Sequence, residues 1–339
     1  SMSLTRRQKW RIEKVQSERI ARANKAAIET EKNFRNKEVS QKGRVITRYG
    51  QRQLVESSTG KLFQCTGRQN IGLSVAGDEV IFQPAGGVEG IVTAILPREN
   101  ELSQKNKLIA TNIDQLWLVV ATEPHYQFEL IDRYLILAEN SNLPINIIVN
   151  KIELLNELDQ LSQDFSLYQN INYQVHFISI KKKLNLDSLK NQLTDKTNIF
   201  LGQSGVGKSS LINTLIPDLE LRVDEISTKS KRGKHTTTNT SIYHIPSGGD
   251  LIDSPGIREF QLDDFDAKQI LNGFREFKEL IGKCRFRNCQ HINEPDCEVK
   301  VALNSGDIHP SRYKNYLNLL LLPPLWLVLV IQLGDKYVN

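Results

Sequence analysis

The sequence is poor in cysteine and has no long, unbroken apolar run. Four cysteines in 339 residues are too few for a scaffold held together by disulfides. No apolar segment follows the basic N-terminus, which argues against a secretory signal. The apolar stretch from Leu319 to Leu333 is interrupted by Pro323 and Pro324 and is shorter than the roughly 20 residues of a membrane span. We therefore expect a cytoplasmic protein without a membrane segment.

The composition excludes several other classes of protein. Hydrophobic residues make up 39% of the chain and charged residues 24%, which are ordinary values for a globular protein. Collagen-like, coiled-coil and wholly disordered chains are excluded by these values. The length predicts two or three domains, each large enough to bury a core.

Positive charge is concentrated at the N-terminus. Residues 1–48 contain 14 Lys/Arg and 5 Asp/Glu, whereas the other residues contain 30 and 34. A basic arm on a mildly acidic body favours a polyanionic partner, because each phosphate contact releases a counterion. A solvated, charged helix would have the same composition. We assign residues 1–42 to this arm and a polar linker.

Residues 43–104 contain five short runs typical of β-strands, separated by turn residues at intervals of about ten residues. This pattern predicts a small antiparallel barrel of the OB-fold kind, which often binds RNA. Small barrels without a role in nucleic-acid binding have the same pattern. Cys65 lies in one of these strands, where we expect a buried thiol.

Strands and helices alternate over residues 105–262, which predicts an α/β domain with a parallel sheet. The apolar runs at 115–122 and 145–150 resemble buried strands, and residues 128–140 have helical periodicity. Residues 152–170 are expected to be helical and residues 174–180 to form a strand. Residues 263–339 are expected to form helices around a Cys/His cluster, followed by the apolar tail.

A phosphate-binding loop is the strongest single motif. Residues 202–209 read GQSGVGKS and match G-x-x-x-x-G-K-[ST], between an apolar strand end and a helix. Backbone N–H groups of such a loop wrap a phosphate, Lys208 would reach the β- and γ-phosphates, and Ser209 would ligate Mg²⁺. The expected nucleotide-binding residues here are Gly202, Gln203, Ser204, Gly205, Val206, Gly207, Lys208, Ser209 and Ser210. The alternative is a glycine-rich turn without a ligand.

Two further segments fit a nucleotide hydrolase. Asp253 and Gly256 form a D-x-x-G motif after an apolar strand, where the carboxylate would meet a metal-bound water and the glycine N–H the γ-phosphate. Residues 229–240 are basic and rich in threonine. One of Thr236, Thr237 and Thr238 would complete the Mg²⁺ shell, and we favour Thr237. An ordinary polar loop is the alternative.

A guanine-reading motif is expected at residues 150–153, at the end of a buried strand. Asn150, Lys151, Ile152 and Glu153 match N-K-x-D except at the last position, where Glu replaces Asp. Glutamate keeps the charge and both acceptor oxygens, so we expect guanine preference to survive in weakened form. Ser179 ends the next strand, where a GTPase has its base-backing loop.

The base motif precedes the phosphate loop in this chain, whereas an ordinary GTPase has the reverse order. The sequence therefore indicates a circular permutation. Its consequence is that the chain leaves the GTPase domain directly after the D-x-x-G motif.

A metal cluster is expected after the GTPase domain. The spacing C-x₄-C-x-H-x₅-C brings Cys284, Cys289, His291 and Cys297 within fourteen residues. A Cys₃His set suits tetrahedral Zn²⁺, and four protein ligands leave no open position, so we expect one structural zinc. The alternative, a disulfide, is disfavoured in a reducing compartment.

With these motifs in place, residues 40–316 resemble the RsgA/YjeQ family of circularly permuted GTPases of small ribosomal subunit biogenesis. The resemblance rests on TNIDQ (111–115), LIDRYL (130–135), GQSGVGKSSL, GKHTTT, DSPGIREF and the Cys/His spacing. It implies a three-domain protein that binds the small ribosomal subunit and its rRNA and hydrolyses GTP to GDP there, late in subunit maturation. We expect a monomer.

Hydrolysis without a partner is expected to be slow. Many GTPases orient the attacking water with a Gln after D-x-x-G, but this chain has Ile257 there. His235, on the threonine-rich loop, is the best replacement, because imidazole exchanges protons near pH 7. A loop histidine that contacts RNA is the alternative. Glu153 and Ile257 also leave open a non-catalytic, nucleotide-binding RNA module, and a P-loop ATPase is a further possibility.

Overall fold

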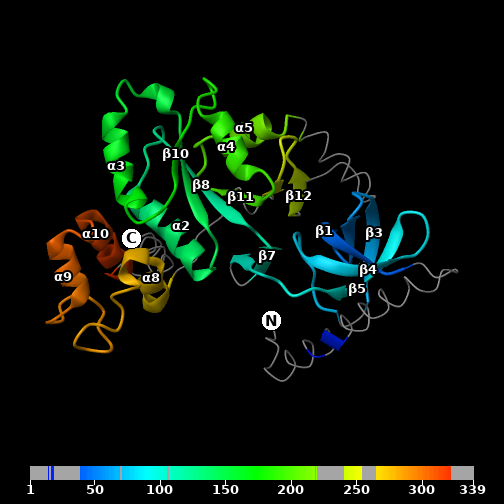
Figure 1. The fold of residues 1–339 in the computed structure, drawn as a ribbon, viewed down its shortest axis with the longest axis horizontal. Helices are drawn as coiled ribbons and strands as arrows, with labels where there is room; N and C mark the ends of the chain where they lie inside the picture. The colour runs from blue at the N-terminus through cyan, green and yellow to red at the C-terminus, as the bar shows by residue number, and fades with distance from the viewer. Residues whose placement is uncertain are drawn as a thin grey trace, which may run out of the picture. The chain divides into compact units, whose positions relative to one another are not determined.

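The computed structural model describes residues 14, 17, 18, 39–68, 71–104, 107–217, 219, 240–253 and 265–321. The chain divides into two compact units. Figure 1 labels most of the helices and strands described below. Unit 1 comprises residues 1–114, 187–200 and 208–259, and unit 2 comprises residues 115–186, 201–207 and 260–339.

A closed five-stranded barrel begins unit 1. Its strands are β1 (Gln41–Tyr49), β2 (Arg52–Ser57), β3 (Leu62–Gly67), β4 (Glu79–Pro84) and β5 (Glu89–Ile95). Strand β1 pairs with both β2 and β4, and the pairs β2–β3, β3–β5 and β5–β4 complete the ring. Closure removes the exposed sheet edges, which confirms the predicted OB-like barrel. The barrel is not wholly antiparallel as predicted, because β3 and β5 pair in parallel.

Apolar side chains that alternate along these strands fill the barrel. Phe63 and Phe82 meet there with ring centroids 4.9 Å apart. Cys65 is buried, as expected, and burial raises the pKa of its thiol to about 12. A Cβ at Gly90 would lie 2.9 Å from the Cys65 sulfur, so only glycine fits this approach of two strands.

The rest of unit 1 is a hairpin and part of the α/β domain. Its elements are β6 (Glu101–Gln104), β7 (Lys107–Thr111), α5 (Lys208–Leu215), β12 (Ser241–His244), β13 (Asp250–Asp253) and all but one terminal residue each of α4 (Leu186–Leu193) and β11 (Thr197–Leu201). Strand β11 is parallel to β13, β13 is antiparallel to β12, and β1 of the barrel pairs with β12 at Thr47 and Ser241. The barrel and this part of the sheet are therefore joined by backbone pairing.

A parallel sheet forms the core of unit 2. Its strands are β8 (Gln115–Ala121), β9 (Ile145–Asn150) and β10 (Val175–Phe177), accompanied by α2 (Phe128–Asn140), the 3₁₀ turn η1 (Ile152–Leu154) and α3 (Asp159–Gln169). Strand β9 is parallel to both neighbours, and every residue of β8 is buried. This confirms the continuous apolar run at residues 115–122 as a buried parallel strand.

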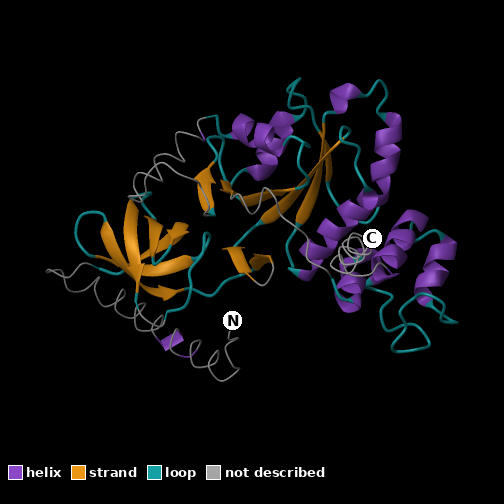
Figure 2. Ribbon diagram, turned by 180° about the vertical axis from the view of Figure 1, so that it is seen from behind, coloured by secondary structure: helices purple, strands orange, loops and turns teal. Residues whose placement is uncertain are grey.

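The C-terminal part of unit 2 is helical (Figure 2). Its elements are α8 (Ala267–Gly273), η2 (Arg275–Phe277), α9 (Glu298–Ser305) and α10 (Pro310–Leu321). The wholly buried Arg312 of α10 forms ion pairs with Glu276 of η2 and with Asp132 of α2. The C-terminal helices are thus connected to helix α2 by buried charges as well as by apolar contacts.

Local differences from the sequence predictions are few. The hairpin β6–β7 was not expected, the helix predicted over residues 152–170 begins only at Asp159, and the strand predicted over 174–180 covers Val175–Phe177. Among the described residues, no helix has the length and apolar character to cross a membrane.

Candidate functional site

The phosphate-binding loop in unit 2 follows β11 and lies against β8 and β9. Gly202 has φ +136°, and a Cβ there would lie 2.2 Å from the carbonyl oxygen of Val119. Gly207 has φ +101°, and a Cβ there would lie 2.4 Å from Nδ2 of Asn150. Both positions therefore need glycine for space and for backbone conformation.

Asn150 connects the base motif to this loop. Its side chain is 2% exposed. Its Nδ2 donates to the carbonyl oxygen of Val206 at 2.9 Å, and its Oδ1 accepts the backbone N–H of Ile180 at 3.3 Å. One amide side chain thus fixes the phosphate loop and the turn after β10 relative to each other.

Lys151 makes a second connection. It adopts a left-handed backbone conformation (φ 64°), and its Nζ donates to the carbonyl oxygen of Gly205 at 2.8 Å. Left-handed backbone is uncommon for a residue other than glycine, and here it turns the chain sharply between β9 and η1. Two consecutive residues of the base motif thus donate hydrogen bonds to two consecutive carbonyl groups of the phosphate loop.

Glu153 lies on η1, close to the fully buried Ser179. Partial burial raises the pKa of its carboxyl. A hydrogen bond with Ser179 and the charges of Lys181 and Lys182 have the opposite and larger effect, so the pKa lies below its ordinary value. One of its oxygens, Oε2, is buried and has no hydrogen-bond partner among the described residues. Such an unpaired acceptor suits a ligand that brings N–H donors.

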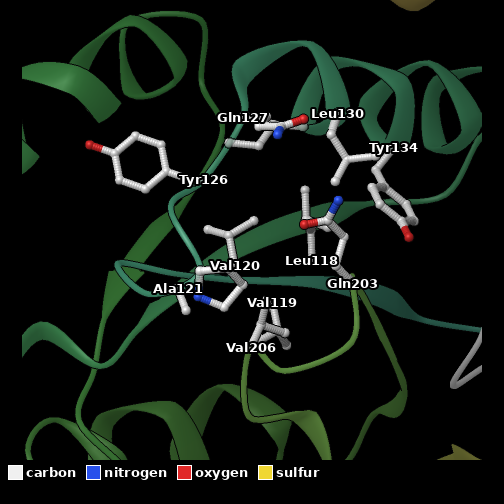
Figure 3. Close-up of a pocket in the computed structure, with 12 residues that line it drawn as sticks. Leu118, Val119, Val120, Ala121, Tyr126, Gln127, Leu130, Tyr134, Gln203 and Val206 are labelled. Carbon is white, nitrogen blue, oxygen red and sulfur yellow. The ribbon is translucent and has the colours of Figure 1, made fainter.

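A small hollow lies behind the phosphate loop (Figure 3). It is lined by Leu118, Val119, Val120, Ala121, Pro124, Tyr126, Gln127, Leu130, Ile131, Tyr134, Gln203 and Val206. Its free space of about 10 Å³ holds about one water molecule. The Tyr134 hydroxyl hydrogen-bonds to the backbone of Gly202, a contact that sequence reasoning missed although Tyr134 lies in the LIDRYL motif. Helix α2 therefore supports the loop from behind.

The remaining described motif residues belong to unit 1. Lys208 begins α5, is 7% exposed, and has its pKa lowered by burial. Ser209 and Ser210 follow and are exposed, and Asp253 is buried at the last position of β13. His235, Thr237 and Gly256 lie outside the described residues.

The four predicted metal ligands are brought together in unit 2. The ligand atoms of Cys284, Cys289, His291 and Cys297 all lie within 4.8 Å of one another. Nδ1 of His291 lies 3.5 Å from the Cys284 sulfur and 3.4 Å from that of Cys297, and these two sulfurs are 4.0 Å apart. Tetrahedral zinc with Zn–S near 2.3 Å requires about 3.8 Å between sulfurs and about 3.6 Å from nitrogen to sulfur. The cluster therefore fits one zinc ion.

Hydrogen bonds outside the cluster fix the chain that carries it. The backbone N–H of Glu298 donates to the Cys284 sulfur at 3.4 Å. Tyr313 and Tyr316 of α10 donate their hydroxyls to the carbonyl oxygens of His291 and Gln290 at 2.7 and 2.8 Å. Such outer contacts orient metal ligands, and here they connect the cluster to the last helix.

Comparisons with known proteins identify the family of this chain. The RsgA GTPase family model matches residues 95–263. The protein named small ribosomal subunit biogenesis GTPase RsgA from Hahella chejuensis is 43% identical over 329 residues, covering 93% of this chain and 94% of that one. Its namesake from Actinobacillus succinogenes is 41% identical, covering 92% and 93%.

Solved structures of similar fold belong to proteins of the same kind. YjeQ from Thermotoga maritima has a TM-score of 0.71 and 30% identity, covering 83% of this chain and 97% of that one. YloQ, described as a circularly permuted GTPase, has a TM-score of 0.69 and 26% identity, covering 91% and 99%. These matches show that the chain belongs to the RsgA GTPase family.

Proposed function

We propose that this protein is a GTPase that binds the small ribosomal subunit, hydrolyses GTP to GDP late in subunit maturation, and is stimulated by the subunit. The names of its relatives support the partner. The observation that carries the nucleotide assignment is the Asn150 side chain, which joins the phosphate loop to the base-backing turn. That arrangement suits a ligand with phosphates at one end and a purine at the other.

The proposed roles follow from the chemistry of each group. Gly202–Gly207 would wrap the phosphates with backbone N–H groups, and Lys208 would neutralise the β- and γ-phosphates. Lowering of the Lys208 pKa by burial reflects a cation kept from water, a cost that an anionic ligand would offset. Glu153 would accept the N–H donors of guanine.

Mg²⁺ would be ligated by Ser209 and Thr237, with Asp253 behind a bound water, and would neutralise charge that develops on the phosphates. His235 is proposed to orient the attacking water when the subunit is bound. A His235→Ala variant should lose subunit-stimulated hydrolysis while it still binds GTP. Unchanged stimulated hydrolysis would show that another group does this work.

The Cys₃His cluster is proposed to bind one structural zinc, because its four positions are all filled by protein ligands. We also propose four parts of the chain, with boundaries at residues 42, 104 and 262, and a cytoplasmic monomer. The cytoplasm is where the proposed partner is found.

One hydrolysis assay tests the proposal against its alternatives. GTP and ATP are each supplied to the purified protein, with and without small ribosomal subunits. We expect hydrolysis of GTP alone, accelerated by subunits. Equal use of ATP would indicate a P-loop ATPase, and GTP binding without hydrolysis under either condition would indicate a non-catalytic RNA-binding module.

A further inference from the structure

The turn between β10 and α4 presents three consecutive exposed lysines, Lys181, Lys182 and Lys183, followed by Leu184. We call residues 181–184 the lysine turn. None of its lysines is in an ion pair with another described residue. Glu153 is an acidic neighbour of the turn, because the charges of Lys181 and Lys182 lower the pKa of its carboxyl. The turn therefore has a local excess of positive charge.

The lysine turn is also well ordered by hydrogen bonds at its base. Ser179 and Leu184 exchange backbone hydrogen bonds of 2.9 and 3.3 Å, and the N–H of Lys182 donates to the Ser179 hydroxyl at 3.0 Å. The side chain of Asn185 donates to the carbonyl oxygen of Phe177 at 2.7 Å. Because these bonds use the backbone and neighbouring side chains, all three ammonium groups remain available to a partner.

The turn is one hydrogen bond away from the base motif. The N–H of Ile180, directly before the turn, donates to Oδ1 of Asn150, whose Nδ2 donates to Val206 of the phosphate loop. A partner on the turn would therefore contact the segment that also positions the nucleotide. Binding of that partner and binding of nucleotide are expected to influence each other reciprocally.

We propose that the lysine turn is a docking surface for the phosphodiester backbone of RNA, and this rests on the proposed function. Consecutive lysines are point charges on flexible stems, which suits a row of phosphates better than one fixed carboxylate. The lysine turn belongs to unit 2, where it directly follows the segment that contacts Asn150 of the base motif.

Salt dependence measures these contacts directly. Each lost phosphate contact lowers the slope of log Kd against log salt by about 0.7–0.9. For the double variant Lys182→Gln/Lys183→Gln, we expect a slope lower by about 1.5 and, at about 0.1 M salt, binding to small ribosomal subunits weakened roughly 30-fold. The glutamines keep the backbone hydrogen bonds of the turn, so the fold of the turn should persist.

Two matched variants make the test specific. Lys268→Gln/Lys314→Gln removes the same charge from exposed positions on α8 and α10, and it should change the slope less. Lys182→Arg/Lys183→Arg keeps the charge and should restore the slope of the unaltered protein. Equal slopes for the two glutamine variants would overturn the proposal.

Protein-free small-subunit rRNA identifies the partner. We expect the lysine-turn variant to lose the same slope with this rRNA as with subunits. A loss seen with subunits but not with rRNA would mean that the turn binds an acidic protein, which contradicts the inference. If the unaltered protein binds subunits but the turn variant matches its control, only the inference fails; if the unaltered protein does not bind subunits, the proposed function fails too.

Discussion

Replacement of Asn150 by alanine tests whether one side chain assembles the nucleotide site. The substitution leaves the carbonyl of Val206 and the N–H of Ile180 without their partner. An unsatisfied buried backbone group costs about 1–3 kcal/mol, and solvent entering the gap would recover part of this. If the phosphate loop and the turn after β10 lose about 2 kcal/mol of the free energy that holds them in place, binding of GDP would weaken by up to about 30-fold.

The assay is titration of each variant with a fluorescent GDP analogue. Asn146→Ala is the matched control, because Asn146 lies on the same strand and its Nδ2 donates to Gln115 at 3.3 Å, away from the loops. We expect its affinity for GDP to stay within about twofold of the unaltered protein. Asn150→Asp keeps the acceptor for Ile180 but puts a carboxylate oxygen against the carbonyl oxygen of Val206, so it should weaken binding at least as much as alanine. Equal affinities for the two alanine variants would refute the reasoning.

Three other perturbations have defined outcomes. Chelation of zinc, or Cys297→Ser, should lower the metal content, measured by elemental analysis, from one ion per chain to near zero. Either change should also lower the unfolding temperature of the C-terminal helices, measured by circular dichroism. Full metal content in the variant would contradict the ligand assignment. Arg312→Met should lower the free energy of unfolding by about 3–5 kcal/mol in a urea titration, because it leaves Asp132 and Glu276 buried without their cation; a loss under about 1 kcal/mol would show that the carboxyls are protonated or hydrated. His244 contacts two carboxylates and its pKa is raised from 6.5 to about 10. Its contribution to stability is therefore complete below pH 6.5 and is lost as pH rises through 10. His244→Gln should reduce the fall in the free energy of unfolding over that range by about 1 kcal/mol, after allowance for solvent screening. Identical pH profiles for the variant and the unaltered protein would contradict this.

The parts of this molecule that sequence could predict are those encoded by adjacent residues. Helix α2 lies where its periodicity indicated, strand β9 has the predicted bounds, and the metal ligands converge as their spacing required. In each case the signal is local: an apolar period, a buried strand with polar ends, or ligand types at short separations.

The parts that could not be predicted depend on partners distant in the chain. The hairpin β6–β7 has only short, mixed strands, so its pattern resembles a loop. The Arg312–Asp132 ion pair joins residues 180 positions apart, and the hydrogen bond from Asn150 to Val206 joins residues 56 apart. No local pattern specifies such pairs, because the sequence around each residue looks like that of an ordinary surface or core position.

The pairing of β1 with two structures has a mechanical consequence. The N-terminal half of this strand closes the barrel against β4, while Thr47, near its other end, pairs with Ser241 of β12. Arg44 of the same strand forms an ion pair with Asp250 of β13 at 2.5 Å. Unfolding of the barrel would break the pairing of β1 with β12 and the ion pair with β13. The barrel and the strands β12 and β13 should therefore unfold in one cooperative transition rather than as independent modules.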